Sequence, residues 1–354
     1  MAGTDPVLQG RGCGYRSAGS SAVCGVTLKM QQGQLAIVIP VWNLPEDLAI
    51  LLDQIATMGI FSQVIIADDA SEPACTPQLV GFGADTLGLD ITYLRSPTQK
   101  GAGHARNMGL DAVRTDNVLF FDADDRLCAD LPLIWQRHLQ AEQADFTIFR
   151  HSDTRVEETE GRRGTFQTEE AMWNRALAGN SAKILTAKER QDLIMISAYP
   201  WNKIYRTAFL RDNDIRCSET PVHNDISLHW LSFLKARQVQ ALDHIGALHV
   251  IGDRGHHLTS RTGEERLCLG GILSELTEQV RQANDNQLMS RFIHFLDDIC
   301  RWNLQRVDPD LVPLFQKLAT DSYLRFTPAE FQIFSAQQPD RAADIVQFLL
   351  SEGA

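Results

Sequence analysis

The chain has 354 residues, of which 44% are hydrophobic and 22% charged, and its formal net charge is -12. This composition is ordinary for a globular protein with a large buried core, and the acidic balance argues against binding to nucleic-acid phosphates. No apolar run approaches the roughly 18–20 residues that span a bilayer, and the N-terminus lacks the pattern of a secretory signal. The seven cysteines are scattered without a CxxC pair, which favours reduced thiols in a cytoplasmic protein.

A leader and then alternating strands and helices are expected in the first half of the chain. Residues 1–33 are rich in Gly, Ser and Gln and predict a disordered leader, with Met30 as a candidate start of translation. Four apolar runs predict buried strands: Leu35–Ile39, Val64–Ala67, Ile91–Leu94 and Val118–Phe121. Helical periodicity covers Glu46–Met58, which Gly59 ends, and Ala102–Val113. Strands that are apolar throughout predict an α/β fold with a mostly parallel central sheet flanked by helices.

The remaining elements are predicted from weaker patterns. They are a helix over Leu131–Gln143, a strand over Phe146–Phe149, a loop or hairpin over 151–167, helical structure over 168–195, an extended segment over Ile215–Pro221, a helix over Asp225–Ala236 and returning strands over Gln238–Val250. From about Glu264 to Leu350 the pattern is helical, with breaks at Pro309 and Pro313. We therefore expect one α/β domain over 34–263 and a C-terminal helical region over 264–354.

The acidic tetrad Asp122-Ala123-Asp124-Asp125 directly follows the fourth predicted strand. Carboxylates held this close repel one another unless a cation or hydrogen-bond donors compensate them. Mg2+ and Mn2+ prefer carboxylate oxygens, and ligands of open α/β sheets bind outside the carboxyl ends of the strands. The tetrad therefore predicts a metal site, although an acidic turn that caps the next helix is the plainer alternative.

Two more strands end in polar or special residues, and a glycine segment follows the third strand. Pro40-Val41-Trp42-Asn43 and Asp68-Asp69 should share one sheet edge with the tetrad, which predicts a single crevice. Residues 101–109 (GAGHARNMG) suggest a dinucleotide-binding loop, but residues 96–100 separate them from the strand, which that fingerprint does not allow. A close-packed helix start near a diphosphate is the better interpretation, with Lys100 and Arg106 as nearby cations. Arg106 has the alternative of a structural ion pair with the acidic edge.

In these four motifs the chain resembles the inverting glycosyltransferases of family 2, which have the GT-A fold. The family pattern is Pro-x-Tyr-Asn, Asp-Asp-x-Ser, Gly-x-x-x-Ala-Arg-Asn-x-Gly and the metal-binding Asp-x-Asp, and this chain departs from it with Trp42 in place of Tyr. Each motif is unspecific alone, but the order and spacing of all four are specific. The resemblance covers roughly residues 34–260 and implies the fold of a nucleotide-diphospho-sugar transferase.

The resemblance also implies roles for individual residues. Trp42 would stack on a nucleobase, or would be a core or rim aromatic, and Asp69 would accept a hydrogen bond from the base. Asp122 would contact the ribose and the metal-bound diphosphate, and Asp124 would ligate the metal, with Asp122 and Asp125 as further candidate ligands. The residues that we assign to the donor are Pro40, Val41, Trp42, Asp69, Lys100, Gly101, Arg106, Asp122 and Ala123.

The second half of the chain supplies a candidate base. Family members often carry Trp-Asn-Lys-x-Tyr-Arg, present here as 201–206, and then Glu-Asp, present here as Asn224-Asp225. Asp225 would deprotonate the acceptor hydroxyl, or cap the helix that follows, or do both. Asn224 replaces the usual Glu, which puts acceptor contacts in doubt. His256 or His257 would complete the metal shell, as a downstream histidine does in some GT-A enzymes, unless both are exposed loop residues.

These observations predict a metal-dependent inverting glycosyltransferase that uses Mn2+ or Mg2+. It would move a sugar from a nucleoside-diphosphate donor, with UDP-sugar the first choice, to a hydroxyl of a glycan or lipid-linked acceptor. A sugar nucleotidyltransferase and a non-catalytic nucleotide-sugar-binding domain are the alternatives. A peripheral contact with the inner face of the membrane is an open option for the C-terminal helices, which carry no motif.

Overall fold

The computed structural model describes residues 33–82, 89–251 and 261–352, and these residues form one compact unit. The leader predicted over 1–33 and the start proposed at Met30 fall, except for Gly33, outside the described residues. The division into an α/β domain and a helical region near residue 263 stays a prediction.

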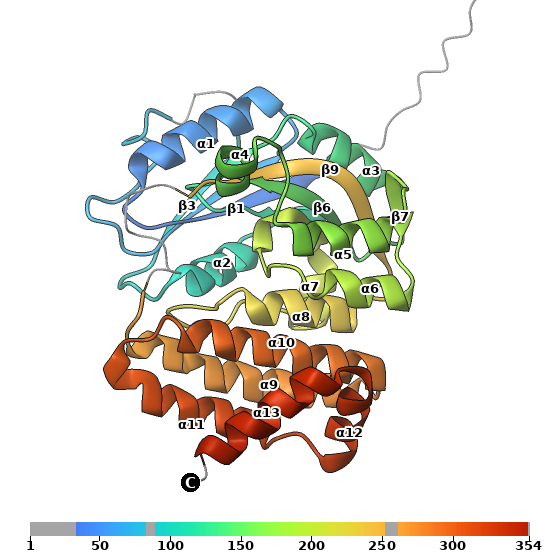
Figure 1. Cartoon of the computed structure of the whole chain (residues 1–354). Helices are drawn as coiled ribbons and strands as arrows, with labels where there is room; N and C mark the ends of the chain where they lie inside the picture. The colour runs from blue at the N-terminus through green and yellow to red at the C-terminus, as the bar shows by residue number, and fades with distance from the viewer. Residues whose placement is uncertain (1–32, 83–88, 252–260, 353–354) are drawn as a thin grey trace, which may run out of the picture. The chain divides into compact units, whose positions relative to one another are not determined.

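Nine strands of the described residues form one sheet, drawn in the upper part of Figure 1. They are β1 Leu35–Val41, β2 Gln63–Asp68, β3 Ile91–Arg95, β4 Asn117–Phe120, β5 Arg126–Leu127, β6 Phe146–Asp153, β7 Ala182–Ile184, β8 Lys203–Arg206 and β9 Val239–His249. Their order is β3-β2-β1-β4-β8-β6-β9-β5, and β7 pairs with β9.

The expected parallel pairing is confirmed for β3, β2, β1 and β4, which are neighbours in that order. Val41 at the end of β1 lies opposite Asp68 at the end of β2, and Val38 lies opposite Phe120 at the end of β4. β8 enters antiparallel between β4 and β6, and β6 runs parallel to β9. The carboxyl ends of β1, β2 and β4 therefore share one edge, where the candidate motifs begin.

Helices cover both faces of the sheet (Figure 1). They are α1 Pro45–Met58, α2 Ala102–Asp111, α3 Leu131–Gln140, α4 Thr154–Glu160, α5 Gln167–Leu177, α6 Ala187–Leu193, α7 Thr207–Asp212, α8 Ile226–Lys235, α9 Leu269–Gln282, α10 Asn286–Leu304, α11 Val312–Tyr323, α12 Pro328–Gln337 and α13 Pro339–Glu352. None of the helices among the described residues is long and apolar enough to cross a membrane.

Two hydrophobic cores lie on opposite faces of the sheet because successive side chains of a strand point to opposite sides. In β1, Leu35 and Ile37 enter the core beneath α1 and α3, whereas Ala36 and Val38 enter the core that α2, α5 and α8 share. The second core continues without interruption into α9–α13. Every side chain of β1 is buried, which explains why its sequence shows no polar alternation.

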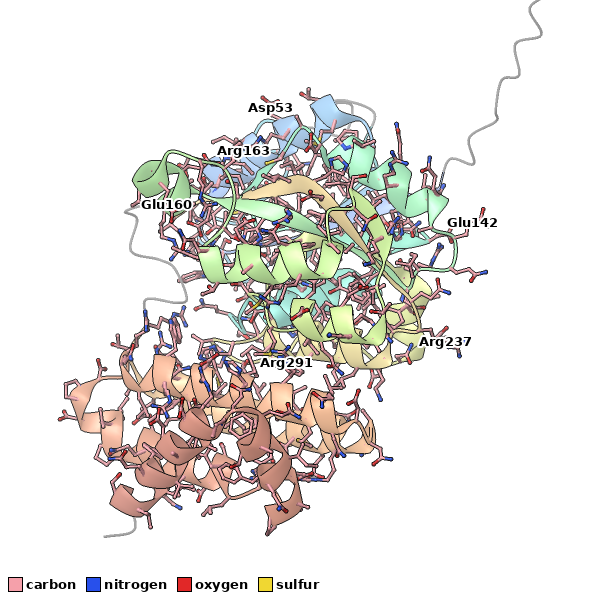
Figure 2. All side chains as sticks on the ribbon, turned by 45° about the vertical axis from the view of Figure 1, so that its right-hand side comes forward. Asp53, Glu142, Glu160, Arg163, Arg237 and Arg291 are labelled. Carbon is pink, nitrogen blue, oxygen red and sulfur yellow. The ribbon has the colours of Figure 1, made fainter. Side chains whose placement is uncertain are left out.

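The C-terminal helices pack against α8, as Figure 1 shows for α9 and α10. The ring of Trp230 in α8 lies 5.0 Å from those of Phe292 and Phe295 in α10. Arg291 of α10, labelled at this junction in Figure 2, reaches to 3.5 Å from the carboxylate of Asp192 in α6. Apolar contacts therefore dominate this junction, and an ion pair stands at its rim.

Several predicted elements need correction. The loop expected over 151–167 is wrong in its first half, because β6 runs to Asp153 and the side chain of Asp153 then caps the short helix α4. The continuous helical stretch expected over 168–195 is interrupted by β7. Ala178 adopts a left-handed conformation that ends α5, and a capping box between Thr186 and Glu189 starts α6.

Other departures depend on pairing between distant segments. The returning strands expected over Gln238–Val250 are the single strand β9, whereas the segment Ile215–Pro221, expected to be extended, belongs to no helix or strand. The short strands β5 and β8 have no clear apolar run and were not predicted. Pro309 lies in the interruption between α10 and α11 as expected, but Pro313 occupies the first turn of α11 and does not break a helix.

Candidate active site

A cleft of about 780 Å3 opens at the edge where β1, β2 and β4 end. It brings together every sequence-predicted site residue that the structure describes: Pro40, Val41, Trp42, Asp69, Lys100, Gly101, Arg106, Asp122, Ala123, Asp124, Asp125 and Asp225. His256 and His257 lie outside the described residues. Residues from five separate parts of the chain therefore meet in one cavity, large enough for a nucleotide-sized ligand.

Asp68, which ends β2, and Asp69, which follows it, order the loops around the cleft. Both oxygens of the Asp69 carboxylate accept backbone N–H groups, from Lys100 at 2.8 Å and from Gly101 at 2.7 Å. Gly101 has a φ of 98°, a conformation that favours glycine, and it immediately precedes α2. Asp68 closes the turn after β2 by accepting from the backbone of Ser71 and Cys75. Asp69 therefore holds the glycine segment in place at the start of α2.

The acidic tetrad concentrates negative charge at the end of β4. Asp125 is buried and accepts a hydrogen bond from the backbone of Val250 at 2.9 Å. Burial, and then the charges of Asp124 and Asp122, raise the pKa of Asp125 well above its usual value. The local field therefore favours a bound proton or a bound cation at this edge.

Arg106 joins the tetrad to the second half of the chain. Its guanidinium donates to Asp122 and to the side-chain oxygen of Asn224, each at 2.6 Å. Burial lowers the pKa of Arg106, but the charges of Asp122, Cys217 and Asp225 and the hydrogen bond to Asp122 together outweigh it, and the net pKa is raised. Nε of Arg106 is buried without a partner among the described residues. Arg106 therefore forms the ion pair with the acidic edge that was the structural alternative. The same side chain also reaches the segment that carries Asp225.

Asp225 stands at the N-cap position of α8, and its side chain lines the cleft. Its carboxylate makes no capping hydrogen bond, so a purely structural cap does not account for it. Burial raises the pKa of Asp225, and the nearby Arg106 opposes the rise. A carboxylate with a raised pKa that faces a cavity is suited to accept a proton.

A buried aromatic and ionic layer forms another wall of the cleft. Tyr199 and Trp201 stack with ring centroids 4.5 Å apart, and Lys203 of β8 is fully buried behind them. Nζ of Lys203 donates to the carbonyl of Tyr199 and the side chain of Asn202, each at 2.6 Å. Burial lowers the pKa of Lys203 to about 7. The family motif at 201–206 thus supplies structural support for the cleft.

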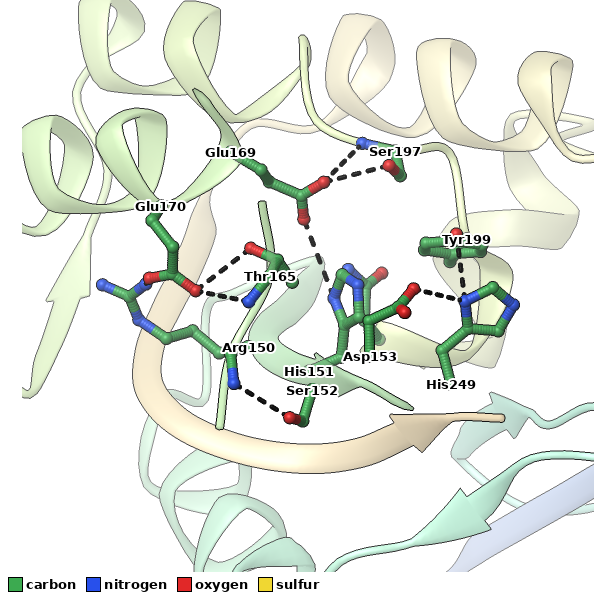
Figure 3. A network of polar contacts seen from close by, with 12 residues as sticks. Arg150, His151, Ser152, Asp153, Thr165, Glu169, Glu170, Ser197, Tyr199 and His249 are labelled. Carbon is green, nitrogen blue, oxygen red and sulfur yellow. Dashed lines mark hydrogen bonds and ion pairs between the residues drawn. The ribbon is translucent and has the colours of Figure 1, made fainter. Parts of the chain in front are cut away.

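His249 at the end of β9 also lines the cleft. Its Nδ1 lies 3.0 Å from the carboxylate of Asp153 and 3.3 Å from the hydroxyl of Tyr199 (Figure 3). Asp153 favours the tautomer that carries the proton on Nδ1, which leaves a lone pair on Nε2. This arrangement was not predictable from sequence, because the three residues come from different parts of the chain and belong to no motif.

The C-terminal region closes the cleft on the side of Asp225. His223, Arg261, Arg266 and Trp302 line this side, and we call these four residues the C-terminal wall. The guanidinium of Arg266 lies 4.8 Å from the ring centroid of Trp302, and the ring of His223 lies edge-on to Trp302 at 6.0 Å. Sequence reasoning missed the whole wall, since no spacing links residue 223 to residue 302.

The carboxylate oxygens of the tetrad have the chemistry and the charge that a divalent cation requires. One oxygen of Asp122 and one of Asp125 are already engaged by Arg106 and by the backbone of Val250. Within residues 33–82, 89–251 and 261–352, no three His, Cys, Asp or Glu side chains are placed to hold a metal ion by themselves. A cation at this edge would therefore need further oxygens from a phosphate ligand or from water.

Comparison with known proteins identifies a matching family model, similar sequences and a similar fold. Residues 36–198 match the family model described as glycosyl transferase family 2. The chain is 24% identical over 269 residues to the poly(ribitol-phosphate) beta-N-acetylglucosaminyltransferase TarS of Staphylococcus aureus strain Mu50, an alignment that covers 74% of this chain and 44% of that protein. It is 34% identical over 97 residues to the amylovoran biosynthesis glycosyltransferase AmsB of Erwinia amylovora, covering 27% of this chain and 32% of that protein. The chain thus spans less than half the length of these curated relatives.

The crystal structure of S. aureus TarS 1–349 in complex with UDP-GlcNAc has the same fold, with a TM-score of 0.72 at 18% identity over 90% of this chain and 89% of that one. The fold is therefore GT-A, the class of α/β fold that handles nucleotide-diphospho-sugars. The family model matched over residues 36–198 is that of glycosyl transferase family 2, the family that the four motifs resemble.

Proposed function

We propose that this protein is an inverting glycosyltransferase that moves a sugar from a UDP-sugar to a hydroxyl group of a glycan or lipid-linked acceptor. The observation that carries the proposal is the single cleft in which the acidic tetrad and Asp225 face the same space. Arg106 connects the two through Asp122 and Asn224. TarS, the relative with the same fold, is an N-acetylglucosaminyltransferase by name, which makes UDP-GlcNAc the first donor to test.

Inversion requires one displacement at the anomeric carbon of the sugar. The acceptor oxygen forms a bond to this carbon while the bond from the carbon to the phosphate oxygen breaks, and the electron pair of that bond leaves with UDP. Asp225 takes the proton of the acceptor hydroxyl, and its raised pKa makes the carboxylate a stronger base. One base is sufficient, because the leaving diphosphate needs charge stabilisation and no proton.

The donor would lie along the edge formed by β1, β2 and β4. Trp42 would stack on the base beside Pro40, Val41 and Asp69, and Lys100, Gly101 and Arg106 would lie near the diphosphate. Asp124 would hold Mn2+ or Mg2+, with Asp122, Asp125 and the undescribed His257 as further candidate ligands. When bound, the cation would neutralise the charge that develops on the leaving group. The scattered cysteines favour a cytoplasmic location.

The proposal is tested by thermal stabilisation with UDP, GDP, CMP and NAD, each with and without Mn2+. Stabilisation by about 2.7 kcal/mol is expected for the correct nucleotide at a hundredfold excess over its dissociation constant. We expect the shift with UDP to require Mn2+ and to disappear in Asp124→Asn, whereas Asp130→Asn, an exposed carboxylate of the next loop, should keep it. The proposal is contradicted if NAD alone gives a shift, or if none of the four nucleotides gives one.

A further inference from the structure

Little local structure holds Asp225 in its place. It precedes α8 at the N-cap position without a capping hydrogen bond, and residues 218–224 before it belong to no helix or strand. A group that takes a proton in the reaction has to be held in position, since a displacement of about 1 Å can cost about a hundredfold in rate. The residues immediately before Asp225, and what holds them, therefore decide where its carboxylate faces the cleft.

His223, two residues before Asp225, has a left-handed backbone. Its φ is 59°, a conformation that residues other than glycine adopt rarely and keep only where the surrounding structure holds them. The carbonyl of His223 accepts the N–H of Ile226, the first residue of α8, at 3.4 Å. Asp225 lies inside this turn. The contact that holds His223 in its left-handed conformation therefore also sets the position of Asp225.

Asn303, near the end of α10, supplies that contact. It is fully buried, and its Oδ1 lies 3.0 Å from Nε2 of His223. Its Nδ2 donates to the carbonyl of Ile299 at 2.8 Å, and its Oδ1 also accepts from Arg266 at 2.6 Å. Because these two contacts fix which end of the amide faces the ring, His223 is the donor. Burial lowers the pKa of His223 to about 4 against the opposing effect of Asn303, so near neutral pH the ring carries one proton, on Nε2.

The end of α10 gives Asn303 a fixed place. The guanidinium groups of Arg266 and Arg306 lie 4.8 Å and 4.2 Å from the ring centroid of Trp302, the residue before Asn303. The carbonyl of Asn303 accepts the N–H of Arg306 at 2.8 Å, which closes the last turn of the helix. The acceptor that faces His223 is therefore held by a packed helix end.

Two distant helices thus hold the two residues that precede Asp225. Arg106 of α2 donates to the side chain of Asn224 at 2.6 Å, and Asn303 of α10 accepts from His223. Asn303 is buried behind the C-terminal wall and is one of the described residues that do not line the cleft. It therefore acts on the cleft only through the side chains in front of it, and His223 is the one that belongs to the turn of Asp225.

We propose that Asn303 is a positioning residue for the base: by accepting the hydrogen bond of His223, it holds the left-handed turn that places Asp225 in the cleft. This inference rests on the proposed function, because it takes Asp225 as the base. It gives the C-terminal helices a part in the transfer step that no motif in them indicates. Because Asn303 lies behind the cleft, it affects the rate of that step and leaves donor binding unchanged.

Four variants test the proposal. Asn303→Leu removes the acceptor oxygen at similar volume, and Asn303→Asp keeps an acceptor in the same place. His223→Gly removes the donor and should fold, because glycine adopts a φ of 59° freely. Tyr323→Phe is the matched control, since it also takes a buried hydrogen bond from α10, the one that the Tyr323 hydroxyl donates to Asp297 at 2.9 Å.

Hydrogen exchange measured by mass spectrometry reports on the turn without any substrate. The peptide 217–226 contains Asp225 and the backbone hydrogen bonds that close the turn around it. We expect this peptide to exchange about tenfold faster in Asn303→Leu and in His223→Gly, since each variant loses a buried hydrogen bond. It should exchange at the unaltered rate in Tyr323→Phe.

Release of UDP from UDP-GlcNAc in the presence of Mn2+, with water in place of the acceptor, measures the effect on the base. The water oxygen forms a bond to the anomeric carbon, the bond to the phosphate oxygen breaks and its electron pair leaves with UDP, and Asp225 takes the proton. We expect kcat to fall about 10–100-fold in Asn303→Leu with KM unchanged, and Asn303→Asp to stay within about threefold of the unaltered protein.

Asn303→Leu also withdraws an acceptor from Arg266, so the double variant with His223→Gly shows which contact carries the effect. When Asn303→Leu is added to His223→Gly, we expect kcat to fall by no more than about twofold further, because the two side chains act as a pair. Losses that multiply in the double variant would assign the effect to Arg266 and overturn the inference.

The remaining outcomes separate this inference from the proposed function. If peptide 217–226 exchanges at the unaltered rate in Asn303→Leu, or if kcat of this variant equals that of Tyr323→Phe, the inference is overturned and the proposed function stands. A loss of kcat that Asn303→Asp shares in full also overturns it, since the acceptor oxygen would then be irrelevant. If UDP neither stabilises the unaltered protein nor is released from UDP-GlcNAc, the proposed function fails, and the exchange rates alone decide whether Asn303 holds the turn.

Discussion

Replacement of Gly103 by alanine is expected to disturb both the stability of the protein and the position of the proposed base, Asp225. Gly103 lies in the first turn of α2, against the segment that leads to α8. A Cβ atom built at this position would overlap the carbonyl oxygen of Ser218 and would lie 2.9 Å from Cβ of Asn224. The obstacle is largely backbone, so a side-chain rotation cannot relieve it. The segment from Ser218 to Asp225 would have to move.

The size of the effect follows from two opposing contributions. A Gly-to-Ala change inside a helix ordinarily stabilises a protein by about 0.5–1 kcal/mol, whereas forcing a methyl group into filled space costs about 1–3 kcal/mol. For Gly103→Ala the cost falls at the upper end, and we expect a net loss of about 2 kcal/mol in the free energy of unfolding. Gly271 in α9 is the matched control, because nothing lies within 4 Å of the Cβ that alanine would add there.

Chemical denaturation of both variants measures this difference. Gly271→Ala should gain about 0.5–1 kcal/mol, which leaves a gap of roughly 3 kcal/mol between the two variants. Transfer activity should also fall in Gly103→Ala, since Asn224 and Asp225 are displaced, and it should be retained in Gly271→Ala. If Gly103→Ala is as stable as the unaltered protein, the close approach of α2 to Ser218 is wrong.

Three further predictions concern individual charged side chains. Asp225→Asn should lower the rate of transfer about 10²–10⁴-fold in a steady-state assay while the UDP-induced thermal shift survives; an unchanged rate would remove Asp225 as the base. Arg106→Lys should lower the free energy of unfolding, measured by chemical denaturation, by about 2 kcal/mol or more, because an ammonium group cannot make both hydrogen bonds to Asp122 and Asn224. Full stability of this variant would contradict the role of Arg106 as a bridge. Burial raises the pKa of Glu169 to about 7 from 4.5, so the stability it contributes is complete below pH 4.5 and is lost as the pH rises to 7. Between pH 4.5 and pH 7 the free energy of unfolding of the unaltered protein should fall by about 3 kcal/mol more than that of Glu169→Gln. An equal dependence of this free energy on pH in the two proteins would refute the raised pKa.

The sheet edge and the donor end of the cleft were predictable from sequence because their signals are local. Each central strand is a continuous apolar run, and the parallel pairing of β1 with β2 and β4 places their carboxyl ends together. The tetrad and Asp69 follow their strands directly, so predicting the strands also placed the side chains. The bounds of α1 and the left-handed Gly59 that ends it were equally readable from the chain.

The remainder depends on contacts that no local pattern encodes. β8 is too short for a visible run and exists because it pairs with both β4 and β6. The helix α4 is polar and begins at the capping side chain of Asp153 within a segment whose composition suggests a loop. The C-terminal wall brings His223 beside Trp302, a juxtaposition produced by the packing of α8 on α9 and α10. Long-range pairing and helix packing therefore decide what the sequence pattern leaves open.

The core that α8 shares with α9 and α10 has a consequence for how this chain can be divided. Trp230 is fully buried, and much of what covers it comes from Phe292 and Phe295. A chain cut after residue 263 would leave the apolar face of α8 open to water, and the helix that begins beside Asp225 would lose its support. Recombination with other GT-A proteins therefore has to transfer α8 and the C-terminal helices together, so the boundary suitable for exchange lies before α8 and not near residue 263.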